Sequence, residues 1–312
     1  MKTIIVYHQV KPGMDCPDGI CAAFIASKYF GYENVELIGE VYLNNSDYEN
    51  YQLPFDPTGR DVFILDFCYP ENVLKQIAGA ANQLIILDHH KDKKPVIDSI
   101  KNFSGRVLGI LKSDTDCGAT ITWDYFYPGI PRPAFLKSVY SRDTGAYGYY
   151  TGDVPHLEAI ANTISALRAG KKGKDAFIVF ELLLKLESTD ILEELGNPII
   201  SERDEMCEIE IENWRQSPHF LDLSQFQDEP NGKYQNVPFI KIKNPKLDEH
   251  YSIVGAKLAK YYQNFFVIVQ KSTEKDSHHL RAHADSPIDC SVIAKSCGGG
   301  GHAKAAGFTI KK

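Results

Sequence analysis

Short aliphatic runs alternate with amphipathic helical patterns through the first part of the chain. The runs that we expect to form strands are Thr3–Tyr7, Val35–Ile38, Asp61–Leu65, Gln83–Leu87 and Val107–Leu111. They are apolar on both faces, and helical segments such as Pro70–Asn82 lie between several of them. Strands that are buried on both sides and joined by helices are typical of a parallel sheet covered by helices. We therefore predict a doubly wound α/β domain with a mostly parallel sheet.

The rest of the chain predicts a second, smaller domain, because 312 residues exceed what one hydrophobic core usually serves. From Cys117 the pattern is helical, and Gly196, Asn197 and Pro198 are expected to end a long helix over Lys174–Leu195. Ser201–Trp214 reads as a further helix. We expect a metal-binding domain over residues 1–196, a helical linker over 197–217 and a second domain over 218–312.

The second domain is expected to be mixed α+β. Its strand candidates are Val237–Ile242, Phe265–Gln270 and His278–Ala282, followed by a short helix over Cys290–Lys295 and a glycine loop.

Charge and cysteine content limit the classes of partner and compartment. The formal net charge of −7 disfavours binding to a long phosphate backbone, so no duplex DNA is expected. The seven cysteines are scattered without a CxxC pair, which favours a reducing compartment over a disulfide framework. The N-terminal apolar run is too short for a signal peptide, and no run approaches membrane-spanning length. We therefore expect a cytoplasmic protein without a membrane partner.

Ionisable residues follow the predicted strands at the point where each strand ends. His8 follows the first run, and Asp15 and Asp18 come after the next turn. Asp66 follows the third run, and Asp88, His89 and His90 follow the fourth. Because ligand sites of open parallel sheets lie at the carboxyl ends of the strands, these side chains are expected to converge. Asp143, in a segment able to fold back over the sheet, is expected to join them.

A cluster of this composition requires positive charge. Two carboxylates about 4 Å apart repel by roughly 4 kcal/mol at an effective dielectric constant near 20, whereas a whole domain is stable by only about 5–15 kcal/mol. Taken singly, Asp66 could be a turn residue or a helix cap, and His8 could be an ordinary surface or core histidine. Taken together, carboxylates and imidazoles favour bound divalent metal, with Mn, Mg, Fe or Co fitting better than structural zinc.

Five motifs, in order, resemble those of the DHH phosphoesterase superfamily. They are DCPDG at 15–19, ILDF at 64–67, LDHH at 87–90, RDTG at 142–145 and, at the C-terminus, LRAH with GGGGHAKAAGF, which resembles the DHHA1 substrate-binding domain. The first motif differs from the usual spacing, in which three residues separate a histidine from D-x-D. Here six residues separate His8 from Asp15, and the aspartates read D-x-x-D.

The resemblance implies two divalent metal ions, Mn²⁺ foremost with Mg²⁺ or Co²⁺ as alternatives. His8, Asp15 and Asp66 would hold one ion, and the second would be held by Asp18, Asp66, His89 and Asp143. Asp66 would bridge the two. Asp88 would orient its neighbours. His90 would face the scissile phosphate, as a hydrogen-bond donor or as the acid for the leaving group.

The function implied is hydrolysis of phosphodiester or phosphomonoester bonds in short oligonucleotides or small nucleotides by a metal-bridging hydroxide. The substrate would be a small phosphorylated molecule or a short single strand. An exopolyphosphatase or pyrophosphatase acting on inorganic phosphate chains is one alternative. A catalytically weak nucleotide-binding regulatory protein is the other. Whether the chain forms a homodimer is left open.

The C-terminal motifs predict an anion site. Gly299, Gly300, Gly301 and His302 are interpreted as a phosphate cradle beside a helix start, with a loop tip or a flexible linker as the plain alternative. Arg281 would grip a terminal phosphate or carboxylate, or else pair with Asp285. Lys304 could assist.

Some residues near these motifs are assigned no chemical role, and for others two roles are considered. Cys16 and Cys68 are interpreted as small buried hydrophobes. His278, His279 and His283 are expected at the surface. Stacking on a base and packing in the core are both open for a set of aromatics, which are Tyr147, Tyr149, Tyr150 and Phe308.

Overall fold

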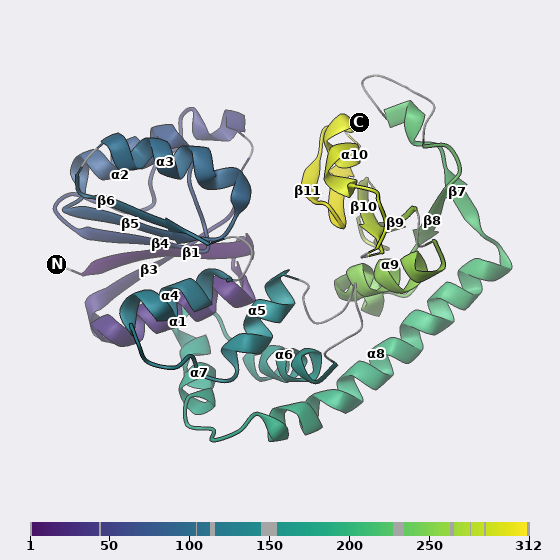
Figure 1. The fold of residues 1–312 in the computed structure, drawn as a ribbon, viewed down its shortest axis with the longest axis horizontal. Helices are drawn as coiled ribbons and strands as arrows, with labels where there is room; N and C mark the ends of the chain where they lie inside the picture. The colour runs from purple at the N-terminus through teal and green to yellow at the C-terminus, as the bar shows by residue number, and fades with distance from the viewer. Residues whose placement is uncertain are drawn as a thin grey trace. The chain divides into compact units, whose positions relative to one another are not determined.

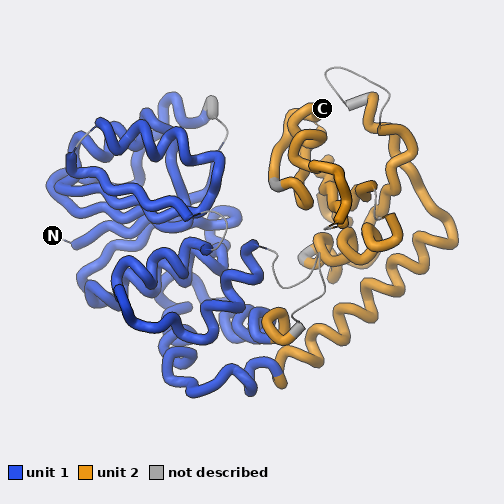
Figure 2. Tube along the Cα trace, in the orientation of Figure 1, with its two compact units in different colours: residues 1–144, 160–193 blue, residues 145–159, 194–312 orange. Residues whose placement is uncertain are grey.

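The computed structural model divides the chain into two compact units (Figure 2). Unit 1 comprises residues 1–144 and 160–193, and unit 2 comprises residues 145–159 and 194–312. The structure describes residues 2–43, 45–103, 105–112, 116–144, 155–226, 234–262, 265–274, 276–283 and 285–310. Two helices, α6 (Pro155–Arg168) and α8 (Asp190–Gln216), contribute residues to both units. The expected linker over 197–217 lies almost wholly within α8.

Unit 1 is built on a mostly parallel sheet. Its strands are β1 (Thr3–Lys11), β2 (Met14–Asp15), β3 (Val35–Glu40), β4 (Asp61–Leu65), β5 (Gln83–Asp88) and β6 (Val107–Leu111). The parallel strands lie in the order β3-β1-β4-β5-β6, and the short β2 pairs antiparallel with the end of β1. The chain starts in β1, adds β3 on one side and then builds β4, β5 and β6 on the other. The strand order therefore reverses next to β1, which is where open α/β sheets form ligand sites.

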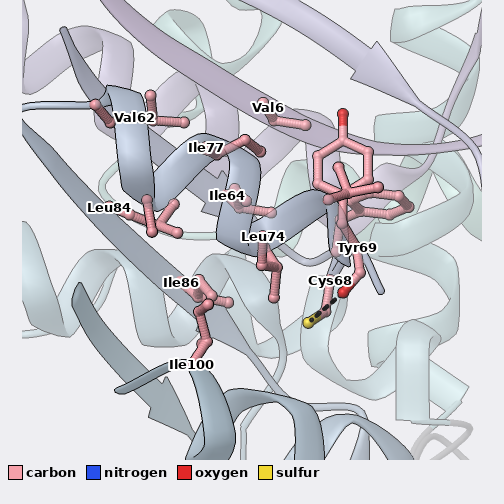
Figure 3. Close-up of a cluster of buried hydrophobic side chains, with 14 of the residues drawn as sticks. Val6, Val62, Ile64, Cys68, Tyr69, Leu74, Ile77, Leu84, Ile86 and Ile100 are labelled. Carbon is pink, nitrogen blue, oxygen red and sulfur yellow. Dashed lines mark hydrogen bonds between the residues drawn. The ribbon is translucent and has the colours of Figure 1, made fainter. Parts of the chain in front are cut away.

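Helices cover both faces of this sheet (Figure 1). The helices α2 (Glu71–Ala80) and α3 (Lys94–Phe103) lie on one face, and α1 (Pro17–Phe30) and α4 (Gly118–Phe126) lie on the other. Figure 3 shows the first of these interfaces, where Ile64, Leu84 and Ile86 of the strands pack against Leu74 and Ile77 of α2. The doubly wound α/β fold expected from the sequence is confirmed. Unit 1 also contains α5 (Leu136–Thr144) and α7 (Phe177–Leu183), together with parts of α6 and α8.

Unit 2 contains a second sheet, which is largely antiparallel. Its strands are β7 (His219–Leu221), β8 (Val237–Lys241), β9 (Phe266–Gln270), β10 (Ser277–Ala282), β11 (Gly300–His302) and β12 (Ala305–Thr309), in the order β11-β12-β10-β9-β8-β7. Of the described pairs, β8 and β9 are parallel and the others antiparallel. One face packs on α8 and α9 (Tyr251–Ala259), and the other on α10 (Cys290–Ser296). This is the mixed α+β unit that the sequence predicts.

The helix boundaries around Gly196 differ from the prediction. The expected Lys174–Leu195 helix is interrupted after α7, and α8 runs from Asp190 through Pro198 without ending. Its start is marked by Ser188, whose hydroxyl accepts a hydrogen bond from the Asp190 amide at 3.1 Å. Gly196 is buried, and a Cβ there would lie 2.0 Å from the carbonyl oxygen of Ala159. The glycine thus allows two helical segments to approach closely and does not stop the helix.

The cysteines are all free thiols, and six of the seven are buried. None of the helices in the described ranges combines the length and the apolar composition that crossing a membrane requires.

Candidate metal centre

Five of the six predicted metal ligands converge at the carboxyl edge of the sheet in unit 1. His8 lies in β1, Asp66 directly follows β4, and His89 directly follows β5. Asp18 lies in the first turn of α1, and Asp143 lies in the last turn of α5. These elements meet beside the point where the strand order reverses.

Asp66 is the centre of this group. The Nε2 atom of His89 lies 3.2 Å from Oδ1 of Asp66, and Nδ1 of His8 lies 3.5 Å from Oδ2. His89 Nε2 is also 3.2 Å from Oδ2 of Asp143 and 3.9 Å from Oδ2 of Asp18. One carboxylate therefore stands between two imidazoles, and two further carboxylates approach one of them.

The backbone at Asp66 is held in an uncommon conformation. Its φ of 55° lies in the left-handed region, which costs a residue other than glycine on the order of 1 kcal/mol or more. The Asp66 amide donates to the carbonyl of Leu87 at 3.0 Å, which fixes the turn against β5. The carboxylate is 1% exposed, and neither of its oxygens accepts a well-formed hydrogen bond within the described ranges. Two buried acceptors of this kind fit a bound cation.

Asp18 is positioned by the start of α4. Its carboxylate accepts hydrogen bonds from the amides of Gly118 at 2.6 Å and Ala119 at 2.7 Å. A Cβ on Gly118 would lie 2.5 Å from Cβ of Asp66 and 3.0 Å from Oδ2 of Asp18. Only a glycine lets α4 begin this close to both carboxylates. The helix N-terminus also favours a negative charge at this point.

The electrostatics of the group show an excess of negative charge. Burial, followed by the charges of Asp66 and Asp143, raises the pKa of Asp18 well above its usual range. Burial and then the charge of Asp66 raise the pKa of Asp143 to about 6. Burial opposes ionisation of Asp66, but the imidazoles of His8 and His89 outweigh it and hold the pKa of Asp66 low.

His89 responds to the same charges. Its burial disfavours the protonated ring, but the neighbouring carboxylates, Asp66 first, outweigh burial and raise the pKa of His89 to about 10. Without a metal, the site therefore collects a proton in place of a cation. The carboxylate and imidazole donors suit divalent ions such as Mn²⁺, Mg²⁺ or Co²⁺. The residues present fit the metal that the sequence predicts.

His90 is oriented by Asp88, the last residue of β5. Oδ1 of Asp88 lies 2.7 Å from Nδ1 of His90 and accepts a hydrogen bond from the amide of His89 at 2.8 Å. Burial lowers the pKa of His90, but the interaction of its Nδ1 with Asp88 outweighs burial and raises that pKa. Because Nδ1 bonds to Asp88, Nε2 is the ring nitrogen left to face a ligand. Asp88 is fully buried, as a residue that orients its neighbours requires.

Asp15, the sixth predicted ligand, is not brought to this group. One of its oxygens accepts hydrogen bonds from the hydroxyl of Tyr7 at 2.9 Å and from Nε2 of Gln9 at 2.8 Å. The other accepts from the amide of Gly173 at 2.8 Å. The carboxylate therefore ties β1 and β2 to the turn at Gly173. Instead, Cys16 lies with His8 and Asp66, their donor atoms all within 4.8 Å of one another.

Sequence reasoning missed Tyr42 beside this site. The ring of Tyr42 lies 5.2 Å from the ring of His8 and 5.9 Å from that of His90, measured between centroids. The ammonium of Lys93 lies 4.8 Å from the same ring. The place of Tyr42 in the sequence could have suggested it, since it follows β3 at the edge where the other strand tips carry ionisable residues. It was missed because a tyrosine side chain is not a usual metal ligand, and the search at the strand ends was for metal ligands.

The predicted anion cradle in unit 2 differs from expectation. No helix begins after the glycines, because residues 305–309 form β12. Gly300 and Gly301 belong to β11, and a Cβ on Gly299 would lie 2.1 Å from the carbonyl oxygen of Gly307. Close strand packing therefore accounts for Gly299 and Gly301, whereas a Cβ on Gly300 would meet nothing within 4 Å. His302 ends β11, and its side chain lies outside the described part.

Arg281 is buried in β10, with 5% of its surface exposed. Its guanidinium donates to the carbonyl of Leu280 and to the hydroxyl of Ser252, both at 2.7 Å, and lies 5.0 Å from the ring centroid of Tyr251. Asp285 pairs with His283 at 3.4 Å instead. Nε of Arg281 has no hydrogen-bond acceptor within the described ranges. Lys304 donates to the carbonyls of Ser286 and Ile288.

The remaining predictions for side chains near the motifs have mixed outcomes. His278 was expected at the surface but is buried, its ring stacked on Phe308 with centroids 5.1 Å apart. His278 lies on the face of β10 that points into the core. Phe308 packs in the core, which is one of the two roles that the sequence left open for it. Tyr147, Tyr149 and Tyr150 lie outside the described residues.

Comparison with known proteins yields distant similarities. No profile of a protein family matches the chain. An uncharacterised protein, R106 of Acanthamoeba polyphaga mimivirus, is 26% identical over 319 residues, which cover 98% of this chain and 67% of that protein.

Three solved structures are similar over 99% of this chain. They are the pGpG-specific phosphodiesterase PggH of Vibrio cholerae, at 13% identity over 93% of that chain with a TM-score of 0.49; RecJ of Thermus thermophilus in complex with Mn²⁺, at 14% over 49% with 0.44; and CDC45 of Entamoeba histolytica, at 10% over 92% with 0.42.

Proposed function

We propose that the chain is a metal-dependent phosphohydrolase of the DHH type, which hydrolyses phosphodiester or phosphomonoester bonds of short oligonucleotides or small nucleotides. The observation that carries this proposal is Asp66, whose two buried oxygens face His8 on one side and His89 on the other without a well-formed hydrogen bond. The ordered motifs at residues 15–19, 64–67, 87–90 and 142–145 supply the residues around it.

We propose that the donor set holds two divalent ions. We assign Asp66 to both, with His8 on one side and with Asp18, His89 and Asp143 on the other; Mn²⁺ is the first candidate, and Mg²⁺ and Co²⁺ are alternatives. Such ions supply charge neutralisation at the phosphate and lower the pKa of bound water. No nucleophilic side chain is then required.

The chain's own contribution to the reaction is positioning and proton transfer. Asp88 holds Nδ1 of His90, so that Nε2 can donate a hydrogen bond to a phosphate oxygen or a proton to the leaving group. The helix start at Gly118 and Ala119 fixes Asp18, and the turn bonded to Leu87 fixes Asp66. Each group is therefore held before substrate arrives, as efficient electrostatic catalysis requires.

We propose that unit 2 contains substrate-binding residues. Arg281 and the Gly299–His302 segment remain the proposed contacts, with the buried Nε of Arg281 as the donor still lacking an acceptor in the described part. We propose a single-stranded or small phosphorylated substrate, since the net charge of −7 opposes binding along a duplex.

A substrate panel tests the proposal. It contains a dinucleotide, pAp, a cyclic dinucleotide, pyrophosphate and polyphosphate, each assayed with Mn²⁺ and with Mg²⁺. Release of mononucleotide or of a terminal phosphate from a nucleotide substrate is the expected result. Turnover of inorganic chains alone would favour a polyphosphatase or pyrophosphatase. Binding without turnover would favour a nucleotide-binding regulatory protein.

The His90→Ala variant tests the assignment of roles. We expect turnover to fall by about 10²–10⁴-fold, the usual contribution of a positioned acid or base, while metal content stays at the wild-type level. Asp143→Asn is the matched comparison, because it removes a proposed ligand and should lower metal content and turnover together. Equal loss of metal in both variants would contradict the role assigned to His90.

A further inference from the structure

Cys16 occupies a position in the metal centre that neither its small size nor its burial explains. It is the N-cap residue of α1 and is 7% exposed. Its amide donates to the carbonyl of His8 at 3.3 Å, which holds the two residues side by side. Its sulfur lies within 4.8 Å of a ring nitrogen of His8 and of a carboxylate oxygen of Asp66. The sulfur therefore has an imidazole and a buried carboxylate without a well-formed hydrogen bond among its neighbours.

The position that the sequence assigned to Asp15 is thus filled by another side chain. The Asp15 carboxylate accepts three hydrogen bonds from Tyr7, Gln9 and Gly173, so it is satisfied where it lies. Cys16 and Asp18 are separated by Pro17 alone, which reproduces the two-residue step of a D-x-D pair with sulfur in place of the first carboxylate. The spacing and the geometry agree on Cys16.

The other buried thiols of the sheet edge differ from Cys16. Cys68 donates to the carbonyl of Tyr69 at 3.4 Å, and Cys117 caps α4 together with Thr120. Among the residues that the structure describes, Cys16 is the cysteine that groups with both an imidazole and a carboxylate at metal-binding separation.

We propose that Cys16 is a metal ligand, so that His8, Cys16 and Asp66 form one metal position and Asp18, Asp66, His89 and Asp143 form the other. This inference rests on the metal centre of the proposed function and deepens it. Thiolate is a soft donor that selects zinc and other late first-row ions, whereas carboxylate and imidazole also accept Mn²⁺ and Mg²⁺. The two positions should therefore differ in metal preference, with Zn²⁺ or Co²⁺ favoured at the Cys16 position. Three protein ligands also leave room for water or substrate.

Cobalt spectroscopy of the full chain tests the inference independently of turnover. Titration of the metal-free protein with Co²⁺ should produce the near-ultraviolet charge-transfer absorption of a cobalt–thiolate bond. Cys16→Ser and Cys16→Asp should both remove that absorption. Asp15→Asn is the matched control from the adjacent residue, and it should retain the absorption at wild-type intensity.

Metal preference gives a second readout. Cys16→Asp replaces sulfur with the hard oxygen donor of the usual motif, so it should still bind two ions while its preference for Zn²⁺ over Mn²⁺ falls by at least the roughly 10–100-fold that the loss of an outer-shell partner costs. This variant also covers the case in which Cys16→Ser does not fold, because it restores a charged ligand.

The outcomes separate this inference from the proposed function. A cobalt-loaded wild-type protein without the absorption, or one whose absorption survives in Cys16→Asp, overturns the role of Cys16 whatever the substrate panel shows. The absorption in a protein that hydrolyses none of the panel supports Cys16 as a ligand and counts against the proposed reaction alone.

Discussion

Gly118 is a residue at which the metal centre leaves no room for a side chain. Its backbone lies so close to Asp18 and Asp66 that an added Cβ would approach within 2.5 Å of Asp66. We expect Gly118→Ala to destabilise the protein by about 1–3 kcal/mol, the usual cost of overpacking. Metal affinity should fall as well, since the two carboxylates must move apart. Denaturant unfolding and metal titration measure the two effects.

Gly79 provides the control for this substitution. It lies in α2 with nothing within 4 Å of an added Cβ. Gly79→Ala should stabilise the protein by about 0.5–1 kcal/mol, because alanine favours a helix interior over glycine, and should leave metal affinity unchanged. A loss of stability or of metal affinity at Gly79 equal to that at Gly118 would show that any added methyl group is damaging.

His89 makes metal binding depend on pH. Its pKa is raised from 6.5 to about 10 by the carboxylates around it, so the proton stabilises the metal-free fold fully below pH 6.5, and this contribution is lost as the pH rises towards 10. A metal requires the neutral ring and must displace that proton. Affinity should therefore rise with pH, by about tenfold per unit for each proton released.

Calorimetry in buffers of different ionisation enthalpy counts these protons. Near pH 8 we expect about one proton to be released from His89 on metal binding. As the pH is lowered from 7 to 5, the number of protons released should increase, because burial and the charge of Asp66 raise the pKa of Asp143 to about 6. Proton release that is absent at pH 8 would contradict a protonated His89 in the metal-free protein.

At the scale of elements, the strands could be predicted from the sequence. Long-range contacts that override the local pattern could not. The limits of β4 and β6 match the expected runs. For β4 the reason is that a strand buried on both faces shows as uninterrupted aliphatic sequence. The convergence of Asp66 and His89 also followed from strand ends. In contrast, the choice between Asp15 and Cys16 depends on the turn between β1 and α1, where β2 reverses the chain and points the carboxylate at Gly173. No local pattern encodes that contact.

Helix α8 shows the same limit and permits a test. Gly196 and Pro198 together read as a helix stop, yet the helix continues because Gly196 packs against the backbone of Ala159. Gly196→Ala would place a methyl group 2.0 Å from a carbonyl oxygen and should cost about 3 kcal/mol.

Pro198 should respond in the opposite direction. It lies exposed in the helix interior and lacks the amide that would donate to residue 194. Pro198→Ala should stabilise the protein by about 1–2 kcal/mol, because alanine restores the hydrogen bond, although the unfolded chain becomes less restricted. Denaturant midpoints of the two variants give the comparison. Loss of stability in both would indicate that the proline is required at this turn.

At the scale of the whole molecule, each unit has a core of its own. Figure 3 shows part of the core in unit 1, whereas unit 2 buries separate clusters on the two faces of its sheet. The proposed metal ligands all belong to unit 1. Since a ligand stabilises only the fold that binds it, Mn²⁺ should stabilise unit 1 by about 2.7 kcal/mol at a concentration one hundred times its Kd and leave unit 2 unchanged.

The two tryptophans of the chain can report this difference, because each unit contains one of them. Trp123 donates to the carbonyl of Ile130 in unit 1, and Trp214 donates to that of Phe239 in unit 2. In Trp214→Phe, fluorescence follows unit 1, and its denaturation midpoint should rise with Mn²⁺. In Trp123→Phe, fluorescence follows unit 2, and its midpoint should stay constant. Equal shifts in both variants would mean that the units unfold as one.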